Sequence, residues 1–229
     1  MNLTDTHLTA EYEHSALITI DVQNDTLDGS PFEIPGTSAI LPRIHRLCQA
    51  FRRAGRPIVH VIRIYTPDGL DADRCRRTSL LAGNQIVLKG SAGRRPADAL
   101  LPDPSIRIDD NLLMGGGIQI IGSDEAIIFK PRWGAFYRTP LETHLKEKGV
   151  STLVVTGCNF PNCTRATIYA ASERDFRICA VEDAISEFTP PDAAWLEKIG
   201  VSSVTTEWVC RHIHQPILPP MKTYGEKNS

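Results

Sequence analysis

Two cysteines lie five positions apart in the stretch TLVVTGCNFPNCTRATIYAAS, which spans residues 152–172. Cys158 and Cys163 suit three kinds of chemistry: a metal site, a disulfide, or one nucleophilic thiol beside a cysteine that takes no part in the reaction. A zinc site needs a second pair of ligands, and the candidates His212 and His214 lie far along the chain. The sequence therefore disfavours a metal at these cysteines.

Two other reactive side chains end apolar segments that read as strands. Asp21 ends ALITID, Lys130 ends EAIIFK, and Cys163 follows STLVVTG after a short turn. Ligand sites in open parallel sheets lie outside the carboxyl ends of the strands. We therefore expect the carboxylate, the ammonium and the thiol to meet at one edge of a sheet, as a set suited to nucleophilic acyl transfer.

Each member of this set has a chemical role. A free thiol has a pKa of about 8.5, and a helix N-terminus with a nearby cation such as Lys130 lowers it, so we expect Cys163 to rest as a thiolate. Asp21 would accept the thiol proton during attack and pass it to the departing nitrogen. Backbone amides over 159–163 would receive the developing oxyanion. Taken singly, each side chain also has a structural explanation: a turn former, a solvated strand end or a small buried hydrophobe.

The elements that must position these residues form a repeating pattern. Apolar segments rich in β-branched residues alternate with segments of helical period, and continuous hydrophobicity is typical of parallel strands covered on both faces. The pattern predicts an α/β fold with an open, mostly parallel, six-stranded sheet and helices on both faces, a Rossmann-type three-layer arrangement. The six expected strands are 16–22, 56–65, 125–130, 151–157, 176–182 and 202–206.

Two helices show clear end signals. One apolar stripe runs through ILPRIHRLCQAFRRAGR and ends at Gly55, where a C-cap belongs. In TPLETHLKEKG we expect Thr139 as N-cap, Pro140 in the first helical position and Glu142 completing a capping box.

The chain is expected to form a single domain over 1–229. Residues 68–122 are rich in Gly, Pro and charge with weak periodicity, so we interpret them as an excursion that shapes the substrate site. GGG at 115–117 lacks the spacing of a dinucleotide fingerprint, and no Walker pattern occurs, so no cofactor is expected. Residues 216–229 read as an irregular tail that packs on the surface or reaches a neighbouring subunit.

Composition excludes several classes of protein. With 229 residues, 41% hydrophobic residues and a formal net charge of −2, the chain is globular and has no basic footprint for nucleic acid. The N-terminus carries no signal-like segment, and no apolar run approaches the roughly 20 residues of a membrane span. We therefore expect a cytoplasmic protein without membrane contact, in which the six dispersed cysteines are free thiols.

Three segments in order resemble the isochorismatase-like cysteine hydrolase superfamily. They are LITIDVQND around Asp21, FKPRWGAFYRTPLETHLKEKGV around Lys130, and LVVTGCNFPNCTRATIYAASERDFRICAVEDAIS around Cys163. The superfamily includes nicotinamidases, N-carbamoylsarcosine and ureidoacrylate amidohydrolases, and isochorismatases. The resemblance implies a catalytic triad at these three residues and a cis peptide bond at Cys158–Asn159, with the amides of Asn159 and Cys163 facing the oxyanion.

The chain also departs from its relatives. DTLDGSPFEIPGTS, after the first strand, lacks the Asp-x-His of metal-binding nicotinamidases, so a bound zinc is disfavoured. Isochorismatases proper lack the nucleophilic thiol, whereas this chain retains Cys163. Cys158 occupies a turn position where relatives usually carry a small apolar side chain, and the turn NFPNC brings Phe160 near the site.

Together these observations predict a cofactor-independent hydrolase of a non-peptide C–N bond in a small amide, ureide or lactam, with a thioester intermediate. We expect Trp133, Phe136 and Phe160 to line the substrate pocket, and Gln23, with its neighbour Asn24, to hold Asp21 or the substrate.

The charge of the substrate stays open. Arg63 and Arg132 suit a substrate carboxylate, whereas the acidic residues Asp68, Asp71 and Asp73 suit a cationic molecule such as a streptothricin-type lactam antibiotic.

Two alternatives remain. An isochorismatase-type vinyl-ether hydrolase would use Asp21 and tolerate loss of Cys163, and a non-enzymatic redox sensor or binding protein would use Cys158 and Cys163 as a switchable pair. The expected partners are a small-molecule substrate and further copies of the chain, in a homo-dimer or homo-tetramer.

Overall fold

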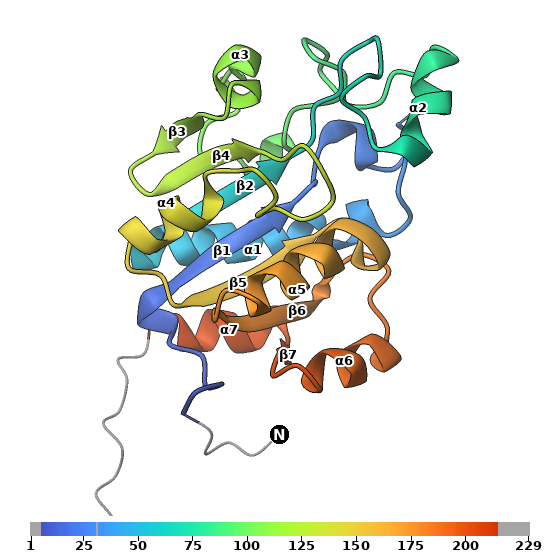
Figure 1. The fold of residues 1–229 in the computed structure, drawn as a ribbon. Coiled ribbons are helices and arrows are strands. Elements are labelled where there is room, and N and C mark those ends of the chain that lie inside the picture. The colour runs from blue at the N-terminus through green and yellow to red at the C-terminus, as the bar shows by residue number, and fades with distance from the viewer. Residues whose placement is uncertain (1–5, 31, 215–229) are drawn as a thin grey trace, which may run out of the picture.

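The computed structural model describes residues 6–30 and 32–214 of the chain, and within them seven strands form one sheet (Figure 1). The strand order is β3-β4-β2-β1-β5-β6-β7. Helices cover both faces, so the α/β fold class is as predicted. The tail predicted at 216–229 lies outside the described residues.

Six of the strands are parallel, and each overlaps one of the six predicted segments. They are β1 (Ser15–Ile20), β2 (Ile58–Ile62), β4 (Glu125–Phe129), β5 (Thr152–Gly157), β6 (Arg177–Ile185) and β7 (Ser202–Val204). Every residue of β1, β2 and β5 is buried. Burial on both faces explains why these segments are continuously apolar.

The seventh strand, β3 (Ile118–Gly122), was not predicted. It pairs antiparallel with β4 at the edge of the sheet, and its residues are only partly buried or exposed. An edge strand does not need to be apolar on both faces. The segment GIQIIGS therefore lacks the signal that marks the other strands, and its sequence is typical of the excursion that surrounds it.

Helices cover both faces of the sheet, and an apolar cluster lies between the sheet and the helices on each face. Apolar residues of α1 (Thr37–Ala54) and α7 (Thr206–His212) pack on one face of the sheet. Those of α4 (Leu141–Glu147), α5 (Arg165–Ser172) and α6 (Pro190–Glu197) pack on the other. Among the described residues, no helix is both long and apolar enough to cross a membrane.

The helix-end predictions had mixed outcomes. Gly55 ends α1 in the left-handed conformation, as predicted, with φ of 61°. The capping box predicted for α4 is wrong, because Pro140 is the N-cap and the Thr139 hydroxyl donates to the Ala135 carbonyl 2.5 Å away. The Glu142 carboxylate instead accepts from Lys146 and Arg174.

The excursion over 68–122 contains α2 (Arg74–Leu81), α3 (Asp110–Met114) and β3. Figure 1 shows its loops and α2 beyond the carboxyl ends of β1 and β2. Part of it forms a small apolar cluster of its own, built on Tyr65 and including Leu80, Ile86 and Val87. The excursion therefore covers the sheet edge where Asp21 and Lys130 emerge.

Candidate active site

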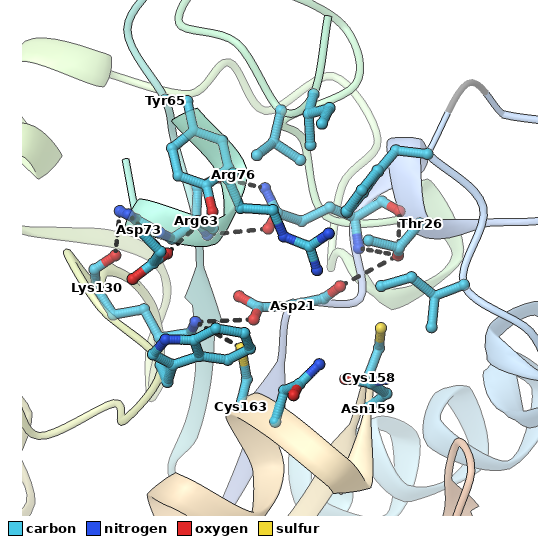
Figure 2. A pocket seen from close by; sticks show the side chains of 17 residues that line it. Asp21, Thr26, Arg63, Tyr65, Asp73, Arg76, Lys130, Cys158, Asn159 and Cys163 are labelled. Carbon is cyan, nitrogen blue, oxygen red and sulfur yellow. Dashed lines mark hydrogen bonds and ion pairs between the residues drawn. The ribbon is translucent and has the colours of Figure 1, made fainter. Parts of the chain in front are cut away.

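Asp21, Lys130 and Cys163 meet at the carboxyl edge of the sheet, and Figure 2 shows their side chains converging from three different elements. Lys130 Nζ lies 2.8 Å from Asp21 Oδ2 and 3.3 Å from Cys163 Sγ. Lys130 is fully buried, and Asp21 is 7% exposed. The structure thus brings together the three residues that the sequence singled out.

Asp21 follows the last residue of β1 in an unusual backbone conformation. Its φ is +49°, in the left-handed region that side chains other than glycine rarely occupy. Its N–H nevertheless continues the sheet by donating to the Val61 carbonyl at 2.9 Å. Strained backbone of this kind concentrates at functional sites, which makes Asp21 a candidate functional residue on grounds independent of its side chain.

Lys130 is positioned as a buried cation. Burial disfavours its charged form, but attraction to the Asp21 carboxylate and to the Cys163 sulfur outweighs burial and raises the pKa of Lys130 above its ordinary value. Lys130 is therefore charged throughout the physiological pH range and forms a buried ion pair with Asp21.

The surroundings of Cys163 favour a protonated thiol and not the thiolate that the sequence predicted. Burial, followed by the negative charge of Asp21, raises the pKa of the Cys163 thiol well above its ordinary value, although Lys130 acts in the opposite direction. Burial is the main reason, and the Asp21 charge adds to it because the carboxylate lies beside the same ammonium as the sulfur. At neutral pH the thiol keeps its proton, so it needs a base at the moment of attack.

The turn that carries Cys163 joins β5 to α5. Residues Phe160–Thr164 form one π-helical turn, and the peptide bond between Cys158 and Asn159 is cis, at the position that the resemblance implied. Among the described residues, the Asn159 N–H has no hydrogen-bond acceptor. Cys158 is buried, which raises the pKa of its thiol to about 12. All six cysteines lie in the described part of the chain and are free thiols.

A cavity of about 50 Å³ opens beside the three residues (Figure 2). Of the four predicted substrate-binding residues, Gln23 and Trp133 line it. The remainder of its wall comes from the segment after β1, from the residues after β2, from the excursion and from the turn between β5 and α5. These further lining residues include Thr26, Phe32, Ile34, Arg63, Tyr65, Asp73, Arg76, Ile86, Val87, Asn159 and Asn162.

The other two predicted substrate-binding residues belong to the core. Phe136 is 5% exposed and packs against Phe176, with 5.8 Å between the ring centroids. Phe160 is 3% exposed and meets Phe188 edge-on at 4.8 Å. Their rings fill the layer between the sheet and α5, so the structure places neither in the cavity wall.

Gln23 lines the cavity, but its side-chain amide forms hydrogen bonds with the protein backbone. Its Nε2 donates to the carbonyls of Arg63 at 2.8 Å and Arg94 at 2.6 Å, and its Oε1 accepts from the Arg63 N–H at 2.9 Å. The neighbouring Asn24 donates to the Ala92 carbonyl at 3.1 Å. Both side chains therefore tie the segment after β1 to the excursion and do not offer their amides to a substrate.

The two arginines suggested for substrate binding also form hydrogen bonds with protein groups. Arg63 is 5% exposed and donates to the Lys130 carbonyl at 3.0 Å and to Asp73 Oδ2 at 3.2 Å. Arg132 donates to the Asp71 carbonyl at 2.9 Å and does not line the cavity. Arg76, in α2, does line it. Arg76 was not among the predicted site residues, because it lies in the excursion over 68–122, whose weak periodicity does not indicate the direction of a side chain.

In the described part of the chain, no group of three or more His, Cys, Asp or Glu side chains is arranged to hold a metal ion. Asp25, the first acidic residue after Asp21, is used structurally, since its Oδ2 accepts from the Val87 N–H at 2.7 Å. The residues present therefore do not fit a zinc site of the nicotinamidase type, and no step is assigned to a metal.

Comparisons with known proteins identify the family of the chain. The family model described as isochorismatase domain matches residues 15–109 and 119–198. A ureidoacrylate amidohydrolase from Methylobacterium radiotolerans is 29% identical over 209 residues, which cover 83% of this chain and 72% of that protein. A protein from Arabidopsis thaliana described as a probable inactive nicotinamidase is 28% identical and covers 86% of this chain and 95% of its own length. The crystal structure of an isochorismatase family protein from Desulfovibrio vulgaris has a TM-score of 0.71 at 30% identity, covering 85% of this chain and 95% of that one.

Proposed function

This chain belongs to the isochorismatase family, and we propose that it hydrolyses a carbon–nitrogen bond other than a peptide bond, in a small amide, ureide or lactam, through a thioester at Cys163. The position of Lys130, 2.8 Å from Asp21 and 3.3 Å from Cys163, is the observation that carries the proposal. The relative named as a ureidoacrylate amidohydrolase supports the class of reaction.

The first half of the reaction acylates the enzyme. The Cys163 thiol gives its proton to Asp21, whose Oδ1 is buried and has no hydrogen-bond partner among residues 6–30 and 32–214. The sulfur forms a bond to the substrate carbonyl carbon, and the carbonyl oxygen becomes an oxyanion that the free Asn159 N–H can stabilise. Lys130 offsets the negative charge while it passes from the carboxylate to the sulfur.

The second half releases the acid. As the oxyanion collapses, the C–N bond breaks and Asp21 gives its proton to the departing nitrogen, which leaves a thioester on Cys163. Asp21, again a carboxylate, takes a proton from water, and the hydroxide oxygen attacks the thioester carbon. The C–S bond then breaks, and the thiolate recovers the proton as the carboxylic acid product departs.

The acidic residues near the site give no support to a cationic lactam. Asp68 and Asp71 do not line the cavity. Asp73 lines it, but its Oδ2 accepts from Arg63 and from the Tyr65 hydroxyl at 3.2 and 3.1 Å. The cavity of about 50 Å³ favours a small amide or ureide over a large antibiotic.

The test compares Cys163→Ser with the wild-type chain on a panel of small amides, ureides and lactams, with release of ammonia or amine as the readout. We expect wild-type turnover, an acyl-enzyme adduct on Cys163 by intact-protein mass spectrometry, and a loss of at least about 1,000-fold in kcat/KM for the variant. Because one relative is described as probably inactive, turnover by the wild-type chain is the first result to obtain.

Cys210→Ser is the matched control, because Cys210 is a partly buried free thiol in α7 and does not line the cavity. It should retain wild-type turnover. Release of ammonia or amine that survives in Cys163→Ser but not in Asp21→Asn would contradict the thioester route and indicate direct attack by water that Asp21 activates.

A further inference from the structure

Among the described residues, the cavity contains one cation without an acidic partner. Among the described residues, five charged side chains line it: Asp21, Arg63, Asp73, Arg76 and Lys130. Lys130 pairs with Asp21 at 2.8 Å, and Arg63 pairs with Asp73 at 3.2 Å. The charges within each of these two pairs cancel, so the net charge of the described cavity wall is the single positive charge of Arg76.

The guanidinium of Arg76 is oriented by an aromatic ring, and its N–H groups remain available to a ligand. Its guanidinium carbon lies 4.6 Å from the centroid of the Phe32 ring, a cation–π contact that fixes the plane of the group. Within residues 6–30 and 32–214, the guanidinium makes no hydrogen bond or ion pair with another side chain or carbonyl. Figure 2 shows it pointing into the cavity on the side opposite Cys163.

The surroundings of Arg76 define what it can bind. Ile34, Ile86 and Val87 also line the cavity, and Ile86 and Val87 belong to the apolar cluster against which Phe32 packs. A planar guanidinium with free N–H groups matches a carboxylate through two parallel hydrogen bonds. A substrate that reaches from Cys163 to Arg76 would thus carry its amide at one end, a short apolar link, and an anion at the other.

On this basis we infer that Arg76 binds a carboxylate of the substrate, so that the enzyme prefers small amides and ureides that carry an acid group over neutral or cationic ones. The inference rests on the proposed hydrolase function. Asp73 does not oppose it, because Arg63 already offsets its charge.

The experiment uses the full-length protein with succinamate and its methyl ester, which differ only in the carboxylate. We expect the wild-type chain to prefer succinamate, and Arg76→Met to lower kcat/KM for succinamate by about 10- to 100-fold, mainly through KM, and to reduce the ratio of kcat/KM for succinamate to that for the ester by a similar factor. Arg76→Lys should recover part of the loss. Arg74→Met is the matched control, because Arg74 lies in the same helix but is exposed and outside the cavity.

A binding measurement separates this inference from the proposed function. Isothermal titration of succinate into the Cys163→Ser protein needs no turnover, and adding Arg76→Met should weaken binding by about 10- to 100-fold. Equal affinity with and without Arg76, or succinate that does not bind at all, overturns the inference even if amides are hydrolysed. Weakened binding in a protein that hydrolyses no amide supports the inference and rejects the hydrolase.

Discussion

Replacing Lys130 with methionine removes the cation between Asp21 and Cys163 and leaves a buried carboxylate without a partner. The side chains of Lys130 and Asp21 are 1% and 10% exposed, so water cannot take the place of the ammonium. Breaking a buried pair by removing one partner costs about 3–5 kcal/mol. We expect Lys130→Met to lower the free energy of unfolding by this amount and to abolish turnover.

The measurement is a double-mutant cycle by urea unfolding, with Lys130→Met, Asp21→Asn and the double variant. If the two groups stabilise each other as the 2.8 Å contact indicates, the double variant should be more stable than the sum of the single losses predicts, by about 2 kcal/mol or more. Lys146→Met is the control, because Lys146 pairs with Glu142 at 2.6 Å on the surface and should cost about 0.5 kcal/mol or less. Additive losses would refute the buried pair as the organising contact of the site.

Three further predictions follow from the same geometry. Asp21→Asn should abolish turnover yet speed alkylation of Cys163 by iodoacetamide at pH 7, because loss of the carboxylate lowers the pKa of the thiol; slower alkylation in the variant would contradict the assignment. Phe136→Leu should lower stability by about 1 kcal/mol with kcat/KM unchanged, whereas Trp133→Leu should change KM with little effect on urea unfolding. Gly157→Ala should lower the midpoint of thermal unfolding by several degrees, measured by circular dichroism, because Gly157 has a φ of +118° and an added Cβ would meet the backbone of β1.

The sequence could predict that Asp21, Lys130 and Cys163 lie together because each follows or ends a strand with a strong apolar signal. The strands that precede Asp21 and Cys163 are buried on both faces, and their apolar runs are unbroken. Parallel strands bring their carboxyl ends to one edge, so residues far apart in sequence could be placed together without knowledge of the loops.

The rest depended on three-dimensional detail. The rise in the pKa of Cys163 depends on how deeply the thiol is buried and on how Lys130 divides its charge between two neighbours. Phe136 follows Lys130 closely enough to suggest either core or cavity, and only packing decides between them. Arg76 lies on a short helix within an aperiodic segment, so its direction was beyond the reach of sequence patterns.

The small apolar cluster that contains Tyr65 stabilises part of the cavity wall separately from the two clusters that flank the sheet. Leu80, Ile86 and Val87 pack with one another and not in the layers that flank the sheet, so a substitution among them is absorbed locally. Asp21, Lys130 and Cys163 are anchored instead in the sheet and the turn before α5. If Arg76 selects the substrate and Cys163 attacks it, as proposed, selectivity and reactivity are stabilised by different apolar clusters of one chain.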